Sequence, residues 1–351
     1  MSKPPEGTPP GSGPLSSATT IGLDWGTSNL RAFLIAADGT VLATRQRPWG
    51  ILSLPPVTAD APQDDRNGRF RTALHDIAAD WMLAAPNARL IACGMVGSAQ
   101  GWAEAPYGRL PADADSLAAG GIDIEIDSSH RLHLVPGLCK DKSDSAPDVM
   151  RGEETQIIGA LTQSPDLRNV LMVLPGTHSK WALIDDRRVV DFATWMTGEF
   201  YSVLAQHSIL GRLLGNQPSG TAPDPAPGAA ADATRYAADD GFFRGIDLAR
   251  SSEAGDLTHQ LFSVRTLGLV RQVPSERLRE LMSGLLIGHE IISGQRFAGR
   301  ARRPLVLIGE PTLCERYRLA FARVGRKVDR VIENPAPAGL HRLAMLKGTK
   351  P

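Results

Sequence analysis

Residues 24–28, Asp-Trp-Gly-Thr-Ser, place a carboxylate directly before a short turn that carries two hydroxyl groups. The runs on both sides are apolar, as expected for two buried strands. A buried strand end tolerates an unpaired carboxylate poorly, so Asp24 needs a partner. Gly26 allows another backbone to approach closely, and Thr27 and Ser28 supply hydroxyl and amide donors. Donors beside a carboxylate suit a phosphate chain that carries a magnesium ion.

A second Gly-Thr turn lies 150 positions later, within Leu-Pro-Gly-Thr-His-Ser-Lys-Trp at 174–181. Gly176 and Thr177 stand between apolar runs that resemble those around the first turn. Two halves that begin alike indicate a duplicated α/β fold with a cleft between the halves. Two facing Gly-Thr turns could grip a triphosphate from both sides. His178 and Lys180 follow the second turn closely enough to face the same cleft.

Between the two turns, the segment MRGEETQIIGA at 150–160 opens an apolar helical pattern with two adjacent acids, Glu153 and Glu154. Acids at a helix N-terminus commonly stabilise the helix, so capping is one interpretation of either residue. The other interpretation is catalytic, because transfer of a phosphoryl group to a hydroxyl needs a carboxylate to accept the proton. The pattern does not decide which acid would be that base.

Strand patterns alternate with helical patterns along the chain, which predicts an α/β protein. Each Gly-Thr turn joins the first two strands of a three-strand run, and the first run is followed by a helical pattern at 69–84 and a buried strand near 90. Near the end of the chain, a buried strand leads through Gly309 into an amphipathic helix. Gly309 is either a plain strand-to-helix connection or a backbone surface for a planar base.

The composition excludes several classes of protein. Lys plus Arg and Asp plus Glu both number 38 in 351 residues, which argues against a nucleic-acid or membrane-surface binder. The three cysteines form no zinc or disulfide pattern and are expected to be thiols in the cytoplasm. No apolar run approaches the ~20 residues that span a bilayer. Residues 1–18 read as a disordered tail, and residues 216–240, rich in Pro and Ala, as a mobile loop.

Taken together, these segments resemble the actin-like sugar kinases, which share their fold with hexokinase and the Hsp70 ATPase domain. DWGTSNLRA is similar to their first phosphate motif, GEETQIIG with PGTHSKW to their acid and second phosphate segment, and VLIGEPTL to their adenosine segment. Within that superfamily, GMVGSAQGW, VPGL, VMRGEETQIIGA, LPGTHSKW, FATWMTGE and SGLLIGHE resemble the 2-dehydro-3-deoxygalactonokinase family. The resemblance runs from about residue 20 to residue 345.

The resemblance implies two ribonuclease H-like (actin-like ATPase) domains with an interdomain cleft. The expected ranges are 19–165 for the first phosphate and sugar-acid contacts, and 166–351 for the second phosphate and adenosine. The implied reaction transfers the γ-phosphoryl group of ATP, with Mg²⁺, to the C6 hydroxyl of 2-dehydro-3-deoxy-D-galactonate in galactonate catabolism. A homodimer is compatible with the sequence, which does not decide the oligomeric state.

The resemblance also implies roles for individual residues. Asp24 would hold the hydration shell of Mg²⁺, and Glu153 would be the base, with Glu154 as the alternative. The superfamily typically has aspartate after a glycine at this place, whereas Glu153 follows Gly152 here. The implied nucleotide-binding residues are Gly26, Thr27, Ser28, Gly176, Thr177 and Gly309. The implied substrate-binding residues are Arg151, Ser98, His178 and Lys180.

Three alternatives stay open at this level. The chain could phosphorylate another sugar or another 3-deoxy-2-keto sugar acid. It could also be a non-enzymatic actin-like module that uses the same phosphate turns without an acceptor. Arg151 could pair locally with Glu153 or Glu154 instead of binding a substrate carboxylate.

Overall fold

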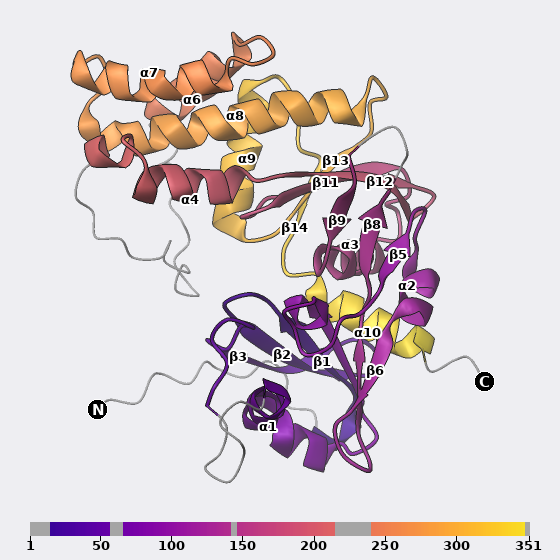
Figure 1. The fold of residues 1–351 in the computed structure, drawn as a ribbon. Helices are drawn as coiled ribbons and strands as arrows, with labels where there is room; N and C mark the ends of the chain where they lie inside the picture. The colour runs from indigo at the N-terminus through magenta and orange to yellow at the C-terminus, as the bar shows by residue number, and fades with distance from the viewer. Residues whose placement is uncertain (1–14, 57–65, 142–145, 215–239, 348–351) are drawn as a thin grey trace. The chain divides into compact units, whose positions relative to one another are not determined.

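The structure, a computed structural model, describes residues 15–56, 66–141, 146–214 and 240–347 (Figure 1). The chain divides into two compact units, the first comprising Met1–Arg168, Asp185–Asp191 and Asn334–Pro351, and the second Asn169–Ile184 and Phe192–Glu333. Residues 1–14 of the tail expected at 1–18, and residues 216–239 of the loop expected at 216–240, lie outside the described residues. The last residues expected in the tail form a 3₁₀ turn, η1 (Leu15–Ser17), and the start of the first strand.

The first unit is built around a six-stranded sheet with helices on both faces. Its strands are β1 (Ala18–Trp25), β2 (Leu30–Ala36), β3 (Val41–Arg47), β4 (Arg89–Gly94), β5 (Tyr107–Arg109), β6 (Ile122–Glu125), β7 (Arg131–Leu134), β8 (Gly137–Lys140) and β9 (Asp148–Met150). Its helices are α1 (Arg66–Ala84), η2 (Met95–Gly97), α2 (Ala114–Gly120), α3 (Glu153–Gln163) and α10 (Ala336–Lys347). The large sheet has the order β3-β2-β1-β4-β7-β6, and a small sheet has the order β5-β8-β9. In the large sheet, β1 is antiparallel to β2 and parallel to β4.

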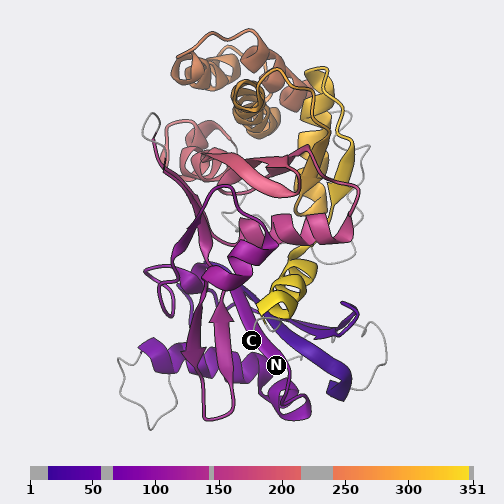
Figure 2. The ribbon, with the colours of Figure 1, turned by 90° about the vertical axis from the view of Figure 1, so that its right-hand side faces the viewer.

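Side chains alternate across β1, so its two faces pack against different helices. Three of its apolar side chains belong to the core that α1 covers: Ile21, Leu23 and Trp25. On the other face, Gly22 leaves room for α10, because a Cβ at this position would lie 3.1 Å from the Leu340 side chain. Figure 2 shows α10 lying against this side of the strands. Asp24 follows in the same alternation, so its carboxylate lies on the α10 face.

Helix α10 returns from the end of the chain to the first unit, where its backbone meets that of α3. A Cβ at Gly159 would lie 1.9 Å from the carbonyl oxygen of Pro335, and a Cβ at Gly339 would lie 2.0 Å from that of Thr155. Only glycines allow two helices to approach so closely. The second unit therefore ends at Glu333, unlike the continuous range 166–351 expected from the sequence.

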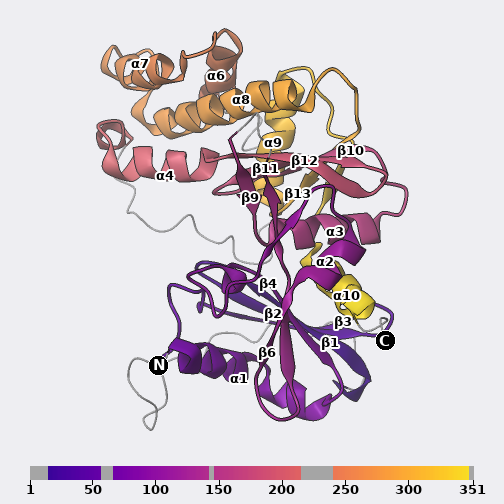
Figure 3. The same cartoon turned by 45° about the vertical axis from the view of Figure 1, so that its right-hand side comes forward.

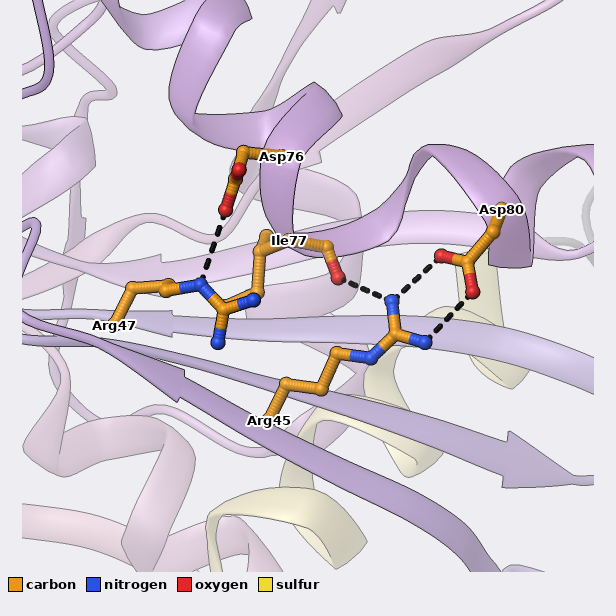
Figure 4. A network of polar contacts seen from close by, with 5 residues as sticks. All are labelled: Arg45, Arg47, Asp76, Ile77 and Asp80. Atoms are coloured by element: carbon orange, nitrogen blue, oxygen red, sulfur yellow. Dashed lines mark hydrogen bonds and ion pairs between the residues drawn. The ribbon is translucent and has the colours of Figure 1, made fainter. Parts of the chain in front are cut away.

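Two arginines of β3, at the edge of the large sheet, form ion pairs with α1 (Figure 4). Arg45 binds both carboxylate oxygens of Asp80, at 2.6 and 2.7 Å, and donates to the Ile77 carbonyl at 2.9 Å. Arg47 donates to Asp76 at 3.0 Å. These contacts are partly exposed, so each stabilises the unit only modestly, by about 0.2–1 kcal/mol.

The second unit repeats the strand order that opens the first. Its strands are β10 (Val170–Leu174), β11 (Ser179–Asp185), β12 (Arg188–Trp195), β13 (Leu305–Ile308) and β14 (Arg330–Ile332). Its helices are α4 (Thr197–His207), η3 (Gly211–Leu213), α6 (Asp240–Arg250), α7 (Leu257–Leu269), η4 (Ser275–Arg277), α8 (Leu278–Ala298) and α9 (Pro311–Arg323). The order β12-β11-β10-β13-β14 matches β3-β2-β1-β4-β7, with β10 antiparallel to β11 and parallel to β13.

Helices inserted between β12 and β13 form a separate layer of the second unit. Helix α8 packs against α4, α6 and α7, and these helices share a core that includes Leu281, Met282 and Leu285 (Figure 3). None of the helices in the described ranges combines the length and apolar composition needed to cross a membrane. Strands and helices fill both units, which confirms the predicted α/β class.

Candidate active site

The first Gly-Thr turn exposes Thr27 and Ser28, and a second loop supports it from behind. The N–H groups of Ile51 and Leu52 donate to the carbonyls of Gly26 and Thr27 at 3.1 and 3.2 Å. Residue 50 must be glycine here, because a Cβ would lie 2.0 Å from the Thr27 carbonyl oxygen. The carbonyls of the turn are therefore occupied. The N–H groups of Thr27 and Ser28 have no hydrogen-bond partner within the described ranges, whereas that of Gly26 donates to the Asn29 carbonyl at 2.9 Å.

The second turn is supported in the same way by the start of α4. The N–H of Glu199 donates to the Thr177 carbonyl at 3.0 Å. A Cβ at Gly198 would lie 2.6 Å from the Gly176 carbonyl oxygen. Thr177 is exposed, as Thr27 is in the first turn. Each unit thus presents a Gly-Thr turn whose carbonyls are held by a neighbouring segment, which leaves amide and hydroxyl donors for an anion.

Helix α3 begins where three backbone segments touch. A Cβ at Gly94, the last residue of β4, would lie 2.7 Å from the Trp25 carbonyl oxygen, and a Cβ at Gly152 would lie 3.2 Å from the Gly94 Cα. Both glycines have positive φ angles, 90° and 111°, which other residues rarely adopt. These contacts bring Glu153, the first residue of α3, to the end of β1 that carries Asp24 and the first turn.

The two acids of α3 differ in their access to solvent. Glu153 is half-buried, and its Oε2 accepts the N–H of Arg151 at 3.0 Å. Glu154 is fully buried, where its Oε2 accepts the N–H of Gly152 at 2.7 Å and its Oε1 accepts the hydroxyl of Thr155 at 3.0 Å. Because a base must reach the substrate hydroxyl, this geometry favours Glu153. Glu154 instead stabilises the start of α3 by accepting these two hydrogen bonds.

The buried acid predicts a pH dependence of stability. Burial, with a smaller contribution from the charge of Glu153, raises the pKa of Glu154 from 4.5 to about 7. Because the folded state holds this proton more tightly than the unfolded chain does, the contribution of Glu154 to the free energy of unfolding is full below pH 4.5 and declines as the pH rises to 7. Glu154→Gln stays neutral and can keep both hydrogen bonds. We expect wild-type stability to fall relative to this variant by about 3 kcal/mol over that range.

Urea unfolding of both proteins between pH 4.5 and 8 measures this difference. Parallel pH profiles for the wild type and Glu154→Gln would show that Glu154 is ionised in the folded state throughout.

Asp24 finds its protein partner on the facing strand. Its Oδ2 accepts a hydrogen bond from Arg31 Nη2 at 2.5 Å, and the two residues lie directly opposite each other on β1 and β2. The Asp24 side chain remains 12% exposed. On the parallel neighbour β4, Cys93 occupies the matching position, and its burial, with the charges of Asp24 and Glu154, raises the pKa of its thiol well above the usual range. Asp24 and the acids of α3 therefore share one end of the sheet.

The guanidinium of Arg151 contacts Tyr107 and Ala105, and two of its nitrogens keep hydrogen-bond donors unpaired. Its Cζ lies 4.3 Å from the centre of the Tyr107 ring, and its Nη2 donates to the Ala105 carbonyl at 2.8 Å. Its Nε and Nη1 are buried and find no hydrogen-bond partner in the described part of the chain. A buried donor without a partner costs about 1–3 kcal/mol, so the two unpaired donors indicate a contact with a group outside the chain. Arg151 forms no ion pair with Glu153 or Glu154 within the described ranges.

Ser98 lies close to Arg151 along the chain but is itself locally bonded. Its hydroxyl donates to the Met95 carbonyl at 2.8 Å, and the side chain is buried. The neighbouring Gly97 is the closer contact, since a Cβ there would lie 3.1 Å from Arg151 Nη1. Ser98 therefore lies beside the residues that contact Arg151, and its hydroxyl is already hydrogen-bonded to the Met95 carbonyl.

The remaining predicted residues lie in the second unit. His178 is exposed and pairs through Nε2 with the Glu199 carboxylate. Lys180 is only 5% exposed, at the start of β11. Gly309 directly follows β13 and has a φ of 149°, and a Cβ on it would lie 3.8 Å from the Pro175 carbonyl oxygen. Gly309 therefore adjoins the second turn, where its missing side chain leaves backbone accessible.

Comparison with known proteins assigns the chain to a family. The sequence profile described as 2-keto-3-deoxy-galactonokinase matches residues 24–343. The chain belongs to this family. A 2-dehydro-3-deoxygalactonokinase of Escherichia coli strain K12 is 32% identical over 330 residues, which cover 93% of this chain and 98% of that protein.

Two further relatives of this 2-keto-3-deoxy-galactonokinase family member come from rhizobia. A protein of Rhizobium meliloti strain 1021, provisionally named 2-dehydro-3-deoxygalactonokinase DgoK1, is 34% identical over 328 residues, or 92% of this chain and 95% of that protein. A crystal structure from Sinorhizobium meliloti, provisionally named as a 2-dehydro-3-deoxygalactonokinase, superposes with a TM-score of 0.76 at 31% identity. It covers 93% of this chain and 97% of that one.

Several features of this 2-keto-3-deoxy-galactonokinase were not found from its sequence. The second unit holds a pocket of about 630 Å³ beside the second turn. Apolar side chains line it together with polar ones: Trp195, Phe200, Leu286, Thr197, Glu199 and Glu290. Glu290 also binds Trp181 and Tyr317. The motifs FATWMTGE and SGLLIGHE contain five of these residues, but neither motif reveals from its own pattern that the two segments meet.

Proposed function

We propose that this kinase transfers the γ-phosphoryl group of ATP to the C6 hydroxyl of 2-dehydro-3-deoxy-D-galactonate, in galactonate catabolism. Membership of the family supports the reaction class. The substrate assignment rests on two residues of the first unit. Glu153 is accessible and lies two positions after Arg151 in the sequence. Arg151 keeps two buried donors unpaired. A base and a carboxylate-binding guanidinium at one helix start suit an acceptor that carries both a hydroxyl and a carboxylate.

Glu153 accepts the proton of the acceptor hydroxyl as its oxygen attacks the γ-phosphorus. The bond from that phosphorus to the β–γ bridging oxygen breaks, and ADP leaves. Positioning and charge stabilisation dominate such a transfer, so the protein needs few reacting groups. The exposed donors of Thr27 and Thr177 bind phosphate oxygens in this proposal. Arg151, whose Nε and Nη1 keep donors unpaired within the described chain, is the cation that this proposal assigns to the acceptor carboxylate.

The residues at the end of β1 fit a magnesium ion that arrives with ATP. Within the described ranges, no group of three or more His, Cys, Asp or Glu side chains is arranged to hold a metal ion. Mg²⁺ commonly binds through one or two carboxylates, with waters and substrate phosphates completing its shell. Asp24 would supply one such carboxylate, because Arg31 binds its Oδ2 and leaves Oδ1 for the hydration shell of the ion. When bound, the ion would neutralise charge on the phosphates.

Both units are assigned the ribonuclease H-like fold of the actin-like ATPases. The shared strand order, with the second strand antiparallel and the fourth parallel to the first, supports this assignment. The first unit would carry the acid and the first phosphate turn, and the second unit the second phosphate turn and the nucleoside. Gly309 adjoins that second turn, and the pocket beside α4 offers apolar walls for a base.

Replacing Arg151 with lysine tests the substrate assignment. Lysine keeps the charge but cannot form two parallel hydrogen bonds to a carboxylate. Loss of such a charged contact costs roughly 1.5–3 kcal/mol, so we expect the KM for the sugar acid to rise about 10- to 100-fold while the KM for ATP changes little. Lys180→Met tests the other candidate cation in the same assay.

Arg187→Lys is the matched control. Arg187 also donates to backbone carbonyls near α3, with Nη2 2.8 Å from the Leu161 oxygen, but it lies at the far end of that helix. Coupled detection of ADP release, with a panel of 3-deoxy-2-keto sugar acids and neutral sugars, gives the KM values. Unchanged acceptor KM in both Arg151→Lys and Lys180→Met would contradict the carboxylate contact. If a neutral sugar is phosphorylated as fast as the sugar acid, the chain is a sugar kinase without specificity for a carboxylate. If ATP drives the formation of filaments without any acceptor, the chain is instead a non-enzymatic actin-like module.

A further inference from the structure

We infer that Glu290 is a positioning residue for the second Gly-Thr turn, acting through a chain of hydrogen bonds that ends on its buried carboxylate. This inference rests on the proposed function only in taking the turn as an ATP phosphate site. Glu290 lies in α8, more than one hundred residues from Gly176, and no hydrogen bond joins its carboxylate to Gly176 or Thr177 in the described part of the chain. Its influence must therefore pass through the side chains between them.

The chain of hydrogen bonds has a single direction. Tyr317 donates its hydroxyl to Glu290 Oε2 at 2.6 Å, since an ionised carboxylate can only accept. The contact of 3.1 Å between the Tyr317 and Ser179 hydroxyls then has Ser179 as its donor. Ser179 Oγ in turn accepts the N–H of Gly176 at 3.3 Å. Ser179 Oγ also lies 3.5 Å from the Gly176 carbonyl oxygen, so Ser179 connects Glu290 and Tyr317 with both backbone groups of Gly176.

A second connection reaches the other side of the turn. The hydroxyl of Thr197, the first residue of α4, also hydrogen-bonds Glu290. Two residues later, the N–H of Glu199 holds the Thr177 carbonyl. Glu290 is thus bonded on one side to the strand that follows the turn and on the other to the helix that supports it.

The site around Glu290 is built to hold a buried carboxylate. The residue is only 2% exposed. Trp181 donates its indole N–H to Oε1 at 2.9 Å, and one helical turn later Gly294 makes room for the indole, because a Cβ there would lie 2.5 Å from the ring. Burial raises the pKa of Glu290, and hydrogen bonds from Thr197, Trp181, Tyr317 and Ser179 oppose that rise. A buried carboxylate with this many donors organises its neighbours, because each donor would otherwise lose its partner.

Tyr317→Phe breaks the chain while keeping the buried ring. Without the tyrosine hydroxyl, Ser179 loses one of the hydrogen-bond partners that hold it below Gly176. We expect the dissociation constant for ATP and the KM for ATP to rise about three- to tenfold, the range for one hydrogen bond. Glu290→Gln should have a larger effect, tenfold or more, because its amide presents donors to Trp181 or Tyr317. The KM for the sugar acid should stay within twofold of the wild type in both variants.

Ser283→Ala is the matched control on the same helix. The Ser283 hydroxyl accepts a hydrogen bond from Arg316 at 2.8 Å, in the same α8–α9 contact but outside the chain to the turn. Melting temperature, calorimetric titration with ATP and both KM values are measured for all three variants. A purely structural role predicts that stability falls while the ATP constants of the folded protein stay at wild-type values. That result in Tyr317→Phe, or an equal change in Ser283→Ala, overturns the inference.

The titration separates this inference from the proposed function, since it needs no acceptor. A wild-type chain that fails to bind ATP would contradict the phosphate assignment of the turn itself. A wild-type chain that binds ATP, with a Tyr317→Phe variant that binds it equally well, would contradict only the role of Glu290.

Discussion

Replacing Glu153 with glutamine should lower kcat by about 10²- to 10⁴-fold, the usual contribution of a positioned general base. Glutamine is nearly isosteric and keeps an oxygen that can accept the Arg151 N–H, so the start of α3 should persist. Only the ability to take a proton is lost. The KM for ATP should change little, because the side chain addresses the acceptor hydroxyl and not the nucleotide.

Glu154→Gln is the matched control for this experiment, since it changes the adjacent acid in the same way. The buried position of Glu154 predicts a much smaller loss of kcat than in Glu153→Gln. Steady-state rates at saturating ATP and sugar acid, with melting temperatures for both variants, make the comparison. A crippled Glu154→Gln beside an active Glu153→Gln would move the base by one residue. Full activity in both would mean that the two acids only cap the helix.

The local elements that carry the site could be predicted because their signals lie within short segments. The strand-turn-strand patterns around Thr27 and Thr177 become β1–β2 and β10–β11, and the Gly-Thr pairs stand in the exposed turns between them. Alternation of apolar residues within a few positions is enough to specify such hairpins. The repeat of the pattern also anticipated that both halves would have the same strand order.

The contacts that support these turns could not be predicted, because they join segments that are distant or unmarked in sequence. Nothing about Gly50 or Gly198 distinguishes them from other glycines until the backbone of each is seen against a turn. Glu290 is similar, since its role depends on three other elements that meet at α8. The return of α10 to the first unit likewise depends on the paired glycines of α3 and α10.

Glu153 and Glu154 show the same limit of prediction from sequence. Both follow Gly152, and both suit a helix N-terminus, so their chemistry is equal in the sequence. Burial separates them, because one points into the protein between Gly152 and Thr155 and the other stays accessible. Arg151 is the opposite case. Its position suggested a substrate contact, and its two unpaired donors support that interpretation.

Asp24→Asn should lower kcat about 10- to 100-fold at a fixed magnesium concentration, as expected for the loss of a charged contact worth roughly 1.5–3 kcal/mol. Asparagine keeps the shape of the side chain and can still accept a hydrogen bond from Arg31. Its neutral amide, however, cannot attract the hydration shell of a divalent ion. The magnesium concentration that gives half-maximal rate should therefore rise in this variant.

Arg31→Gln separates the two roles that the structure allows for Asp24. The 2.5 Å contact between Arg31 and Asp24 means that the carboxylate could serve only as a strand-pairing partner. In that case, removing either partner should have the same effect, namely a lower melting temperature and an unchanged magnesium dependence. If Asp24 serves the metal, only Asp24→Asn shifts the magnesium titration, since Arg31→Gln leaves the carboxylate in place. A folded Asp24→Asn protein with wild-type kcat at saturating Mg²⁺ and an unshifted magnesium titration would rule out the metal role and leave Arg31 as the sole reason for an acid at the end of β1.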